Sequence, residues 1–354
     1  MASTLEADLE MLGKEVDVAD IDRELKEIWE SDGAGTRASL MNFAIYSEAQ
    51  DSLAANSQLL TQLTQEHACR ALLIANLQSC NRDEASVRAW ITAHCQIRGG
   101  QKSVCSEQLS FLLQCGGNRH VRNIVFSHLD SDLPLVFWWQ GDLGANFEDR
   151  LYSVIDRLII DSATWSDPLA DFGHLQNAYL DSSSRFALND LSWSRSLKIR
   201  RAVADCFEDS NSVAELSNLS RISLTHGLLG RIPALMVAAW IADRLKLTPK
   251  PCGTGFFSVE GREIALDTTA DEESSTIGLL TLHTDKATFE IRRDIGDPYI
   301  RTATTIGDRQ STDLIPATRD NEVAHISAQL ERAGNRDRYF SMVPVLEKLI
   351  RNSS

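Results

Sequence analysis

The chain has 354 residues, of which 43% are hydrophobic and 24% are charged, so it is long enough to bury a core in two domains. Its 50 acidic residues outnumber its 35 Lys and Arg residues, and the net charge of −15 opposes binding to phosphate backbones and anionic lipid surfaces. The composition excludes collagen-like, low-complexity and wholly disordered proteins. We therefore expect a folded, soluble protein with no nucleic acid and no membrane among its partners.

Targeting signals are not visible in the N-terminal segment, which has four acidic residues in its first 16 positions and no apolar h-region. The longest apolar run, from Ile232 to Ala242, has 11 residues, far fewer than the roughly 20 that cross a bilayer. The seven cysteines form an odd set without CxxC pairs or zinc-site spacing, which is typical of a reducing compartment. We expect a cytoplasmic protein that holds no metal.

In chain order, residues 1–35 are predicted to form an acidic helical lead-in, because leucine and isoleucine recur there at three- and four-residue spacings. A domain over 36–180 follows. It is predicted to begin with a buried strand over 39–46 and a helix over 47–66, and to continue with strands over 68–77, 86–97 and 103–115. The run over 86–97 alternates apolar and polar residues, as a half-buried antiparallel strand should, and its polar face carries Trp90.

Helices and strands alternate in the rest of this domain. A short helix is predicted over 121–129, where apolar residues recur on one helical face. The run over 134–139 is apolar throughout, as expected of an interior strand, and it places Trp138 and Trp139 on opposite faces. A helix over 147–156 and a strand over 157–162 follow. This order predicts a mixed sheet with helices packed on its faces.

A polar, serine-rich stretch at 176–190 is the predicted domain boundary, and a second domain is expected over 190–354. It is predicted to hold a basic helix over 192–208, a strand over 220–226, an apolar helix over 233–246 and closing helices over 317–332 and 337–351. Five strand-like runs between 255 and 304 predict an antiparallel meander. The predicted fold class is α/β (mixed α+β), with an N-terminal mixed-sheet domain followed by a C-terminal α+β domain.

Motifs for phosphate, acyl and metal chemistry are absent from the sequence. Neither GxxxxGK[ST] nor GxGxxG after a strand occurs, and there is no GxSxG nucleophile elbow, no HExxH and no Cys/His cluster. Asp130 and Asp132 could serve acid and base chemistry, but closing the turn before a strand is the more frequent role of such a pair. We predict that the protein is not an enzyme and has no cofactor.

Three cysteines allow two interpretations. Cys95, Cys105 and Cys115 belong to neighbouring predicted strands and could approach within disulfide range, which would permit redox control. Cysteine is also among the most frequently buried residues, and it then behaves as a small apolar side chain. We favour the second interpretation.

Several segments occur in an order that identifies a family. They are MNFAIY at 41–46, HACR at 67–70, the stretch 104–142 with its CSEQ, DLP and WW steps, RLIIDS at 157–162, the segment 190–209 with Trp193, Arg195, Arg200 and Phe207, and LMVAAWIADRLKL at 235–247. Together they resemble the glucose-6-phosphate dehydrogenase assembly protein family, called OpcA in cyanobacteria and actinobacteria. The chain departs from the family pattern in HACR, which lacks the usual Pro and Ser, and at Ser192 and Ile199, where the family has Asn and Trp.

The resemblance implies a non-catalytic partner of glucose-6-phosphate dehydrogenase that promotes the active oligomer of that enzyme at the entry to the oxidative pentose phosphate pathway. Trp and Arg dominate the hot spots of protein interfaces, so they are the first candidates for the contact surface. The candidate partner-binding residues are Trp90, Asp132, Trp138, Trp139, Trp193, Arg195 and Arg200. For the strand tryptophans Trp90, Trp138 and Trp139, a place in the core is the more frequent alternative.

Two other functions stay open. A sugar-phosphate or nucleotide-binding sensor or enzyme could hold an anion with Arg195, Arg200 and Arg201, although a solvated helix face or pairing with the acidic lead-in also explains these charges. A relay of thiol redox state to the dehydrogenase through Cys95, Cys105 and Cys115 is the third hypothesis.

Overall fold

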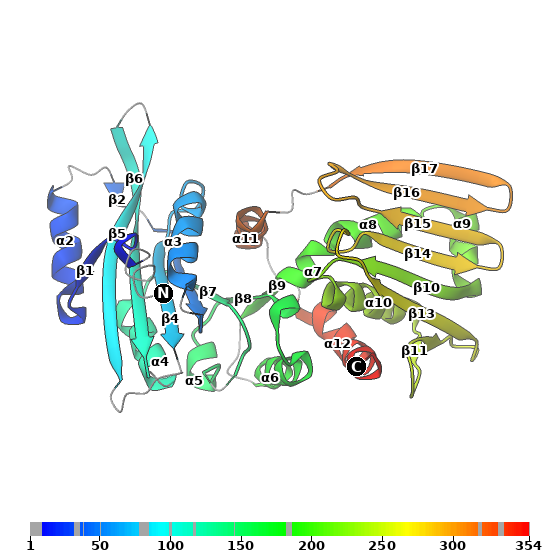
Figure 1. Ribbon diagram of the computed structural model, residues 1–354, viewed down its shortest axis with the longest axis horizontal. Helices are drawn as coiled ribbons and strands as arrows, with labels where there is room; N and C mark the ends of the chain where they lie inside the picture. The colour runs from blue at the N-terminus through cyan, green and yellow to red at the C-terminus, as the bar shows by residue number, and fades with distance from the viewer. Residues whose placement is uncertain are drawn as a thin grey trace. The chain divides into compact units, whose positions relative to one another are not determined.

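The chain divides into two compact units, whose elements are labelled in Figure 1. The computed structural model describes residues 9–31, 36–37, 39–49, 51–77, 85–98, 101–115, 118–144, 146–181, 186–317, 321–331 and 336–353. Unit 1 comprises Met1–Ile160, His174–Asn189 and Ile326–Gly334, and unit 2 comprises Asp161–Gly173, Asp190–His325 and Asn335–Ser354. These units differ from the predicted single boundary at 180–190, because the chain passes from one unit to the other at several points.

A mixed sheet forms the centre of unit 1. In sheet order its strands are β1 (Lys14–Val16), β5 (Ser86–Arg98), β6 (Gln101–Gln114), β4 (Arg70–Leu77), β3 (Asn42–Ser47), β7 (Leu135–Trp139), β8 (Arg157–Ile160) and β9 (Ala187–Asp190), and β2 (Thr36–Arg37) pairs with β6. The strands β6, β4, β3, β7 and β8 are parallel to their neighbours in this run. Numbered by their place in the α/β pattern, these five strands have the order 3-2-1-4-5 of a doubly wound sheet.

The interior of this sheet follows the sequence pattern closely. β7 is buried at every position, which confirms the interior strand predicted over 134–139, since a parallel strand covered on both faces is apolar throughout. β5 pairs with β6 in the antiparallel sense that its alternating pattern predicted. The helices with residues in unit 1 are α2 (Ile21–Ser31), α3 (Ser52–Leu63), α4 (Asn118–His128), α5 (Asp149–Tyr152), part of α6 (Pro168–Leu180) and part of α11 (Glu322–Glu331).

Two predicted elements of unit 1 need correction, and one helix was missed. The lead-in is not helical throughout, because β1 pairs antiparallel with β5 ahead of the short helix η1 (Val18–Asp20) and α2; residues 1–8 and 32–35 lie outside the described part. Gly13 permits this pairing, since a Cβ atom there would lie 2.4 Å from the Ile91 carbonyl oxygen. The helix predicted over 147–156 is the single turn α5, and α6 is a helix that the sequence patterns did not predict.

The sheet of unit 2 has eight strands. In sheet order they are β11 (Thr248–Pro249), β12 (Phe256–Phe257), β13 (Glu263–Ala270), β10 (Leu219–His226), β14 (Leu279–Thr284), β15 (Ala287–Arg292), β16 (Tyr299–Ile306) and β17 (Arg309–Pro316). The strands β14 to β17 form an antiparallel meander. β13 instead lies parallel to β10. The first two runs predicted for the meander, now β12 and β13, therefore lie on the other side of β10 from β14 to β17. The strand β17 was not predicted.

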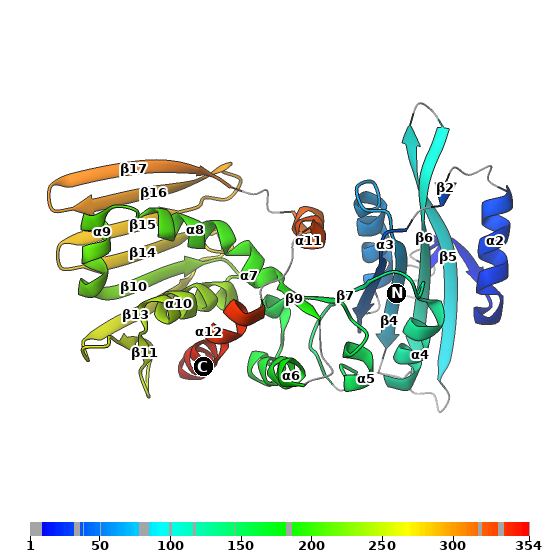
Figure 2. The same cartoon turned by 180° about the vertical axis from the view of Figure 1, so that it is seen from behind.

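Helices cover one face of this second sheet, as both Figure 1 and Figure 2 show. α10 (Arg231–Leu245) packs on β10 and β13, α8 (Leu197–Asp205) packs on β15 and β16, and α12 (Arg336–Asn352) packs on α10. α10 is the apolar helix that the sequence predicted. Within the described ranges, no helix is both long and apolar enough to cross a membrane. The mixed α/β fold class is confirmed.

Candidate functional site

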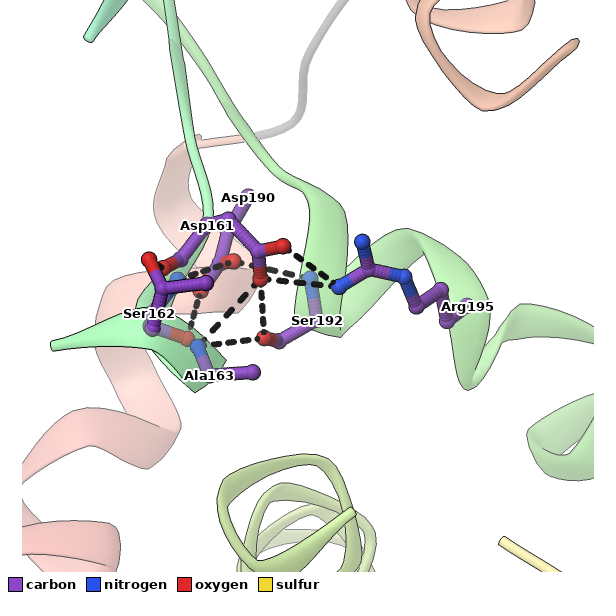
Figure 3. Close-up of polar contacts among 7 residues, drawn as sticks. Asp161, Ser162, Ala163, Asp190, Ser192 and Arg195 are labelled. Atoms are coloured by element: carbon purple, nitrogen blue, oxygen red, sulfur yellow. Dashed lines mark hydrogen bonds and ion pairs between the residues drawn. The ribbon is translucent and has the colours of Figure 1, made fainter. Parts of the chain in front are cut away.

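A network of buried polar side chains lies where β8 and β9 end. We call it the carboxylate network, and Figure 3 labels its residues other than Tyr339. Its members are Asp161, Ser162, Asp190, Ser192, Arg195 and Tyr339. All six belong to unit 2, and all but Tyr339 lie in the two segments, 157–162 and 190–209, that carry the family resemblance in the sequence.

Asp190 is the centre of the network and is 1% exposed. Its carboxylate accepts hydrogen bonds from the Ser162 hydroxyl at 2.7 Å and from the Tyr339 hydroxyl at 2.7 Å. It also accepts the backbone N–H of Ser192 at 2.9 Å and so caps the short helix α7 (Leu191–Arg195). One carboxylate therefore holds together the starts of two helical segments and a residue of α12.

Asp161 supplies the second carboxylate and the ion pair. It caps the 3-10 helix η2 (Ser162–Thr164), accepts the Ser192 hydroxyl at 3.0 Å and pairs with Arg195 Nη1 at 2.8 Å (Figure 3). The Asp161 and Arg195 side chains are 12% and 16% exposed, so the pair is largely removed from water. Charge-assisted hydrogen bonds in such surroundings orient both partners strongly.

The electrostatics of the network are dominated by burial. Burial raises the pKa of Asp190 to about 6, with a smaller contribution from the Asp161 carboxylate, while hydrogen bonds from Ser162 and Tyr339 oppose the rise. Burial beside Asp190 also raises the pKa of the Tyr339 hydroxyl well above its ordinary value. The hydroxyls of Ser162, Ser192 and Tyr339 each donate to a carboxylate, and these bonds fix the segments that carry them relative to one another.

Trp193 and Arg200 stack beside this network. The Arg200 guanidinium carbon lies 3.3 Å from the centroid of the Trp193 ring, and the side chain donates to Ser196 Oγ at 3.1 Å and to the Trp193 carbonyl at 3.0 Å. Tyr339 meets the Trp193 ring edge to face, with centroids 6.2 Å apart. Burial lowers the pKa of Arg200 to about 9. A guanidinium on an aromatic face is stabilised by the ring quadrupole.

Apart from Asp132, the predicted partner-binding residues divide into two groups. Trp193, Arg195 and Arg200 come together at the carboxylate network. Trp90, Trp138 and Trp139 are 2%, 2% and 0% exposed, so these three side chains belong to the core of unit 1. Both faces of the central strand β7 are covered, so Trp138 and Trp139 take the place in the core that was the more frequent alternative for them.

Trp90 is buried for a different reason. Its strand β5 pairs with β1, and the Arg88 guanidinium lies 4.8 Å from the Trp90 ring centroid. The polar face of β5 lies against α3 and the residues just after it, since Thr61 Oγ1 is 3.4 Å from His94 Nδ1 and Gln96 donates to the Thr64 carbonyl at 3.1 Å. The sequence pattern did not reveal this cover. Asp132 is exposed in the turn before β7, where its N–H donates to Asp130 Oδ1 at 3.3 Å. This contact supports the turn-closing role of the Asp130 and Asp132 pair.

The basic cluster of the sensor hypothesis is mostly engaged within the protein. Arg195 is paired with Asp161, and Arg200 is stacked on Trp193, so each has its charge directed at a residue of this chain. Arg201 is exposed. An anion site built from all three guanidiniums would have to break both contacts.

The cysteines on β5 and β6 are paired, contrary to the interpretation that we favoured. Cys95 and Cys105 face each other in the register of the two strands, with Cα atoms 4.0 Å apart, and they form a disulfide. Cys115 is also disulfide-bonded. Among the described residues Cys69, Cys206 and Cys252 are free, and burial raises the pKa of Cys69 to about 12. The predicted reducing compartment therefore has no support from the state of Cys95, Cys105 and Cys115.

A second buried polar contact links two further segments of the resemblance. Arg70, from HACR, pairs with Glu107, from CSEQ, at 3.1 Å, and their side chains are 11% and 1% exposed. The indole N–H of Trp29 donates to the same carboxylate at 2.7 Å. Both segments stand out in the sequence, but nothing there links them, because their pairing needs the parallel register of β4 and β6.

The ends of β3 and β7 carry a group that no sequence pattern indicated. In a doubly wound sheet ligands bind outside the carboxyl ends of the strands at the point where the order reverses, which here lies between β3 and β7. The Tyr46 and Trp139 rings lie at these ends with centroids 4.2 Å apart. The Tyr46 hydroxyl donates to Glu48 Oε1 at 2.8 Å and accepts from Asn146 Nδ2 at 2.8 Å and from Asn76 Nδ2 at 3.2 Å.

We call Tyr46, Glu48, Asn76 and Asn146 the Tyr46 cluster. The loop from β3 to α3 contains Glu48 and Asp51 and no glycine. In dinucleotide-binding sheets this loop holds glycines, which let the backbone approach a pyrophosphate at the helix N-terminus. A carboxylate at this position repels phosphate, so the loop is unsuited to that ligand.

Two long regions of the chain match the domains of a known protein family. Residues 60–177 match the N-terminal domain of the family described as the glucose-6-phosphate dehydrogenase subunit. Residues 186–343 match the C-terminal domain of the same family. The two matches together span most of the chain and include the Tyr46 cluster members Asn76 and Asn146 and the whole carboxylate network.

Curated relatives extend the comparison. The chain is 25% identical over 197 residues to the putative OxPP cycle protein OpcA of Synechocystis sp., covering 54% of this chain and 40% of that protein. The protein of the same description from Nostoc punctiforme is 22% identical over 196 residues, covering 54% of this chain and 41% of that protein. The matched part is thus about two fifths of the length of these relatives.

Among solved structures, an oxidoreductase from Sinorhizobium meliloti is similar with a TM-score of 0.50 and 10% sequence identity, covering 89% of this chain and 98% of that one. At this identity the likeness concerns the fold alone.

Proposed function

Because the chain belongs to the OpcA family of glucose-6-phosphate dehydrogenase subunits, we propose that it binds glucose-6-phosphate dehydrogenase and promotes an active oligomeric state of that enzyme. The proposal places this role in the cytoplasm, at the entry to the oxidative pentose phosphate pathway. To act as an activator, the protein must bind the active state more tightly than the inactive one, since a ligand with equal affinity for two states shifts neither.

The loop from β3 to α3 is the observation that most favours a non-catalytic role. A sheet of doubly wound order is a common scaffold for nucleotide-dependent enzymes, but fold alone does not imply function. In this chain the loop that would face a phosphate carries the acidic residues Glu48 and Asp51, and the Tyr46 hydroxyl at the adjoining strand end bonds to Glu48 and Asn146. These features support a scaffold that has no dinucleotide chemistry of its own.

Mixing experiments test the binding role directly. The purified chain is combined with the dehydrogenase of the same organism, and the mass of the complex is measured by light scattering after size exclusion. We expect a complex, together with a rise in the activity of the dehydrogenase at limiting glucose 6-phosphate. No complex and no kinetic change would overturn the proposal.

Calorimetry separates this role from the sensor or enzyme hypothesis. Glucose 6-phosphate, 6-phosphogluconate and NADPH are titrated separately into the chain. We expect binding weaker than about 1 mM for each, which corresponds to less than about 4 kcal/mol of binding free energy. Micromolar binding of any of them would favour the sensor or enzyme instead.

The disulfide between Cys95 and Cys105 favours one refinement, in which thiol redox state controls the activator. Activation is compared between the oxidised chain, the reduced chain and a Cys95→Ser/Cys105→Ser variant, with Cys115→Ser as a separate arm. A redox relay requires the reduced chain and the double variant to differ from the oxidised chain in the same direction. Equal activation in every arm would remove this refinement.

A further inference from the structure

Two neighbouring leucines are exposed in the turn between β10 and α10. Leu228 is 77% exposed and Leu229 is 60% exposed, and the turn that carries them begins and ends with Gly227 and Gly230. A single exposed leucine is ordinary in a soluble protein. Two side by side at the tip of one turn form an apolar projection that needs a separate explanation.

Backbone hydrogen bonds hold this turn in place. The Gly227 N–H donates to the Ser275 carbonyl at 2.9 Å, and the Gly230 N–H donates to the Gly227 carbonyl at 3.0 Å. A Cβ atom at Gly230 would lie 2.0 Å from the Thr276 carbonyl oxygen, and one at Gly227 would lie 2.6 Å from that of Ser274. The two glycines thus let the turn pack directly against the backbone of segment 271–278.

The same segment is tied to the sheet on both sides of the turn. The Gly278 N–H donates to the Thr225 carbonyl at 2.9 Å, and the Asp271 N–H donates to the His226 carbonyl at 2.9 Å. His226 is buried, and one of its ring nitrogens lies 2.9 Å from the Gly227 carbonyl oxygen. A projection fixed in this way loses little conformational entropy when it binds, which is the condition for an efficient anchor.

Acidic side chains accompany the leucines. Asp271, Glu272 and Glu273 are exposed in the segment that packs against the turn. The next loop is joined to this segment by the Arg293 N–H, which donates to the Gly278 carbonyl at 2.7 Å, and it carries the exposed residues Asp294 and Ile295. The apolar projection therefore has acidic neighbours, and a surface that receives it should be apolar at its centre and basic at its rim.

We propose that residues 227–230 are a docking tip, which inserts Leu228 and Leu229 into an apolar pocket with a basic rim on glucose-6-phosphate dehydrogenase. This inference rests on the proposed function, since it names the surface through which that function is carried out. The acidic segment 271–273 steers the encounter with the basic rim, and the leucines supply the buried contact.

Paired substitutions test the docking tip. Affinity for the dehydrogenase is measured by biolayer interferometry for the full chain and for Leu228→Ser/Leu229→Ser. Leu180→Ser is the matched control, because Leu180 is also 77% exposed but belongs to unit 1. We expect the double variant to bind at least about tenfold more weakly with an unchanged thermal midpoint, and the control to bind as the full chain does.

A second variant keeps the leucines and removes the acidic charge. Glu272→Gln/Glu273→Gln is expected to lower the association rate severalfold at low salt and to leave the dissociation rate almost unchanged. Equal affinity of the full chain and the leucine variant would overturn the docking tip while leaving the proposed function intact. Loss of self-association in light scattering, with unchanged binding to the dehydrogenase, would also overturn it by assigning the tip to a second copy. Failure of the unaltered chain to bind would overturn both proposals.

Discussion

The carboxylate network and the Tyr46 cluster occupy similar places, since each lies where parallel strands of the first sheet end, but they are paired differently. In the network, Asp190 accepts three short hydrogen bonds and Asp161 is neutralised by Arg195. In the cluster, the side-chain oxygens of Asn76 and Asn146 are buried without a hydrogen-bond partner. The first group is a satisfied, charged arrangement, and the second is a partly satisfied, mostly neutral one.

This difference in hydrogen bonding predicts how strongly the stability of the fold depends on each group. α/β proteins bind ligands at the strand ends where the sheet order reverses, which is the place of the Tyr46 cluster. A fully paired network stabilises the fold only while every member is present, because a donor that loses its buried acceptor keeps its desolvation cost. In a partly paired group, a substitution removes fewer hydrogen bonds. Substitutions in the network should therefore cost more than substitutions in the cluster.

The largest effect is expected for Asp190→Ala. This change leaves the Ser162 and Tyr339 hydroxyls and the Ser192 N–H without their acceptor in a buried place, so we expect a loss of about 3 kcal/mol in the free energy of unfolding. Urea titration followed by tryptophan fluorescence measures it. Asp132→Ala, at an exposed turn, is the control and should change stability little. A loss below about 1 kcal/mol would show that the network is not a structural lock.

An intermediate effect is expected from pH. The folded pKa of Asp190 is raised from 3.8 to about 6, so the folded chain holds this proton more tightly than the unfolded chain does. The contribution of Asp190 to stability is therefore complete below its ordinary pKa and is lost as the pH rises towards about 6. Relative to Asp190→Asn, the unaltered chain should lose up to about 1.4 kcal/mol per pH unit between about pH 4 and 6. If the free energy of unfolding changed with pH in the same way for the two proteins, the pH dependence would not come from Asp190.

The smallest effect is expected for Tyr46→Phe. The change removes the hydroxyl that donates to Glu48 and accepts from the two asparagines, while the ring stays against Trp139. We expect a loss of about 1 kcal/mol in the free energy of unfolding. Tyr299→Phe is the control, because Tyr299 is 44% exposed. A loss equal to that of Asp190→Ala would abolish the contrast between the two groups.

Much of the fold could be predicted because it depends on local pattern. The apolar run of β7, the alternation of β5 and the buried helix α10 follow from periodicity and composition alone. α6 was missed because the polar stretch at its end suggested a boundary. β17 was missed because nearly all of its residues are exposed and the run from Arg309 to Asp313 is polar. A strand at the edge of a sheet needs no apolar face, so it leaves a weak pattern.

The candidate site was only partly predictable. Trp193, Arg195 and Arg200 lie within one segment, and their grouping followed from short spacing. Tyr339 joins Asp190 across 149 positions of the sequence, and no pattern near Tyr339 indicates that contact. The pairing of Cys95 with Cys105 depends on the register of β5 and β6, which a shift of one residue would abolish.

The amino-acid sequence by itself determined the acidic charge, the absence of phosphate and metal motifs, the family and the class of fold, because each depends on composition or on order along the chain. Only the tertiary structure decided which tryptophans are buried, which carboxylate has a raised pKa and which leucines are exposed. These properties depend on what a second segment places over a side chain. Such coverage is set by packing between residues far apart in the sequence, and local patterns do not contain it.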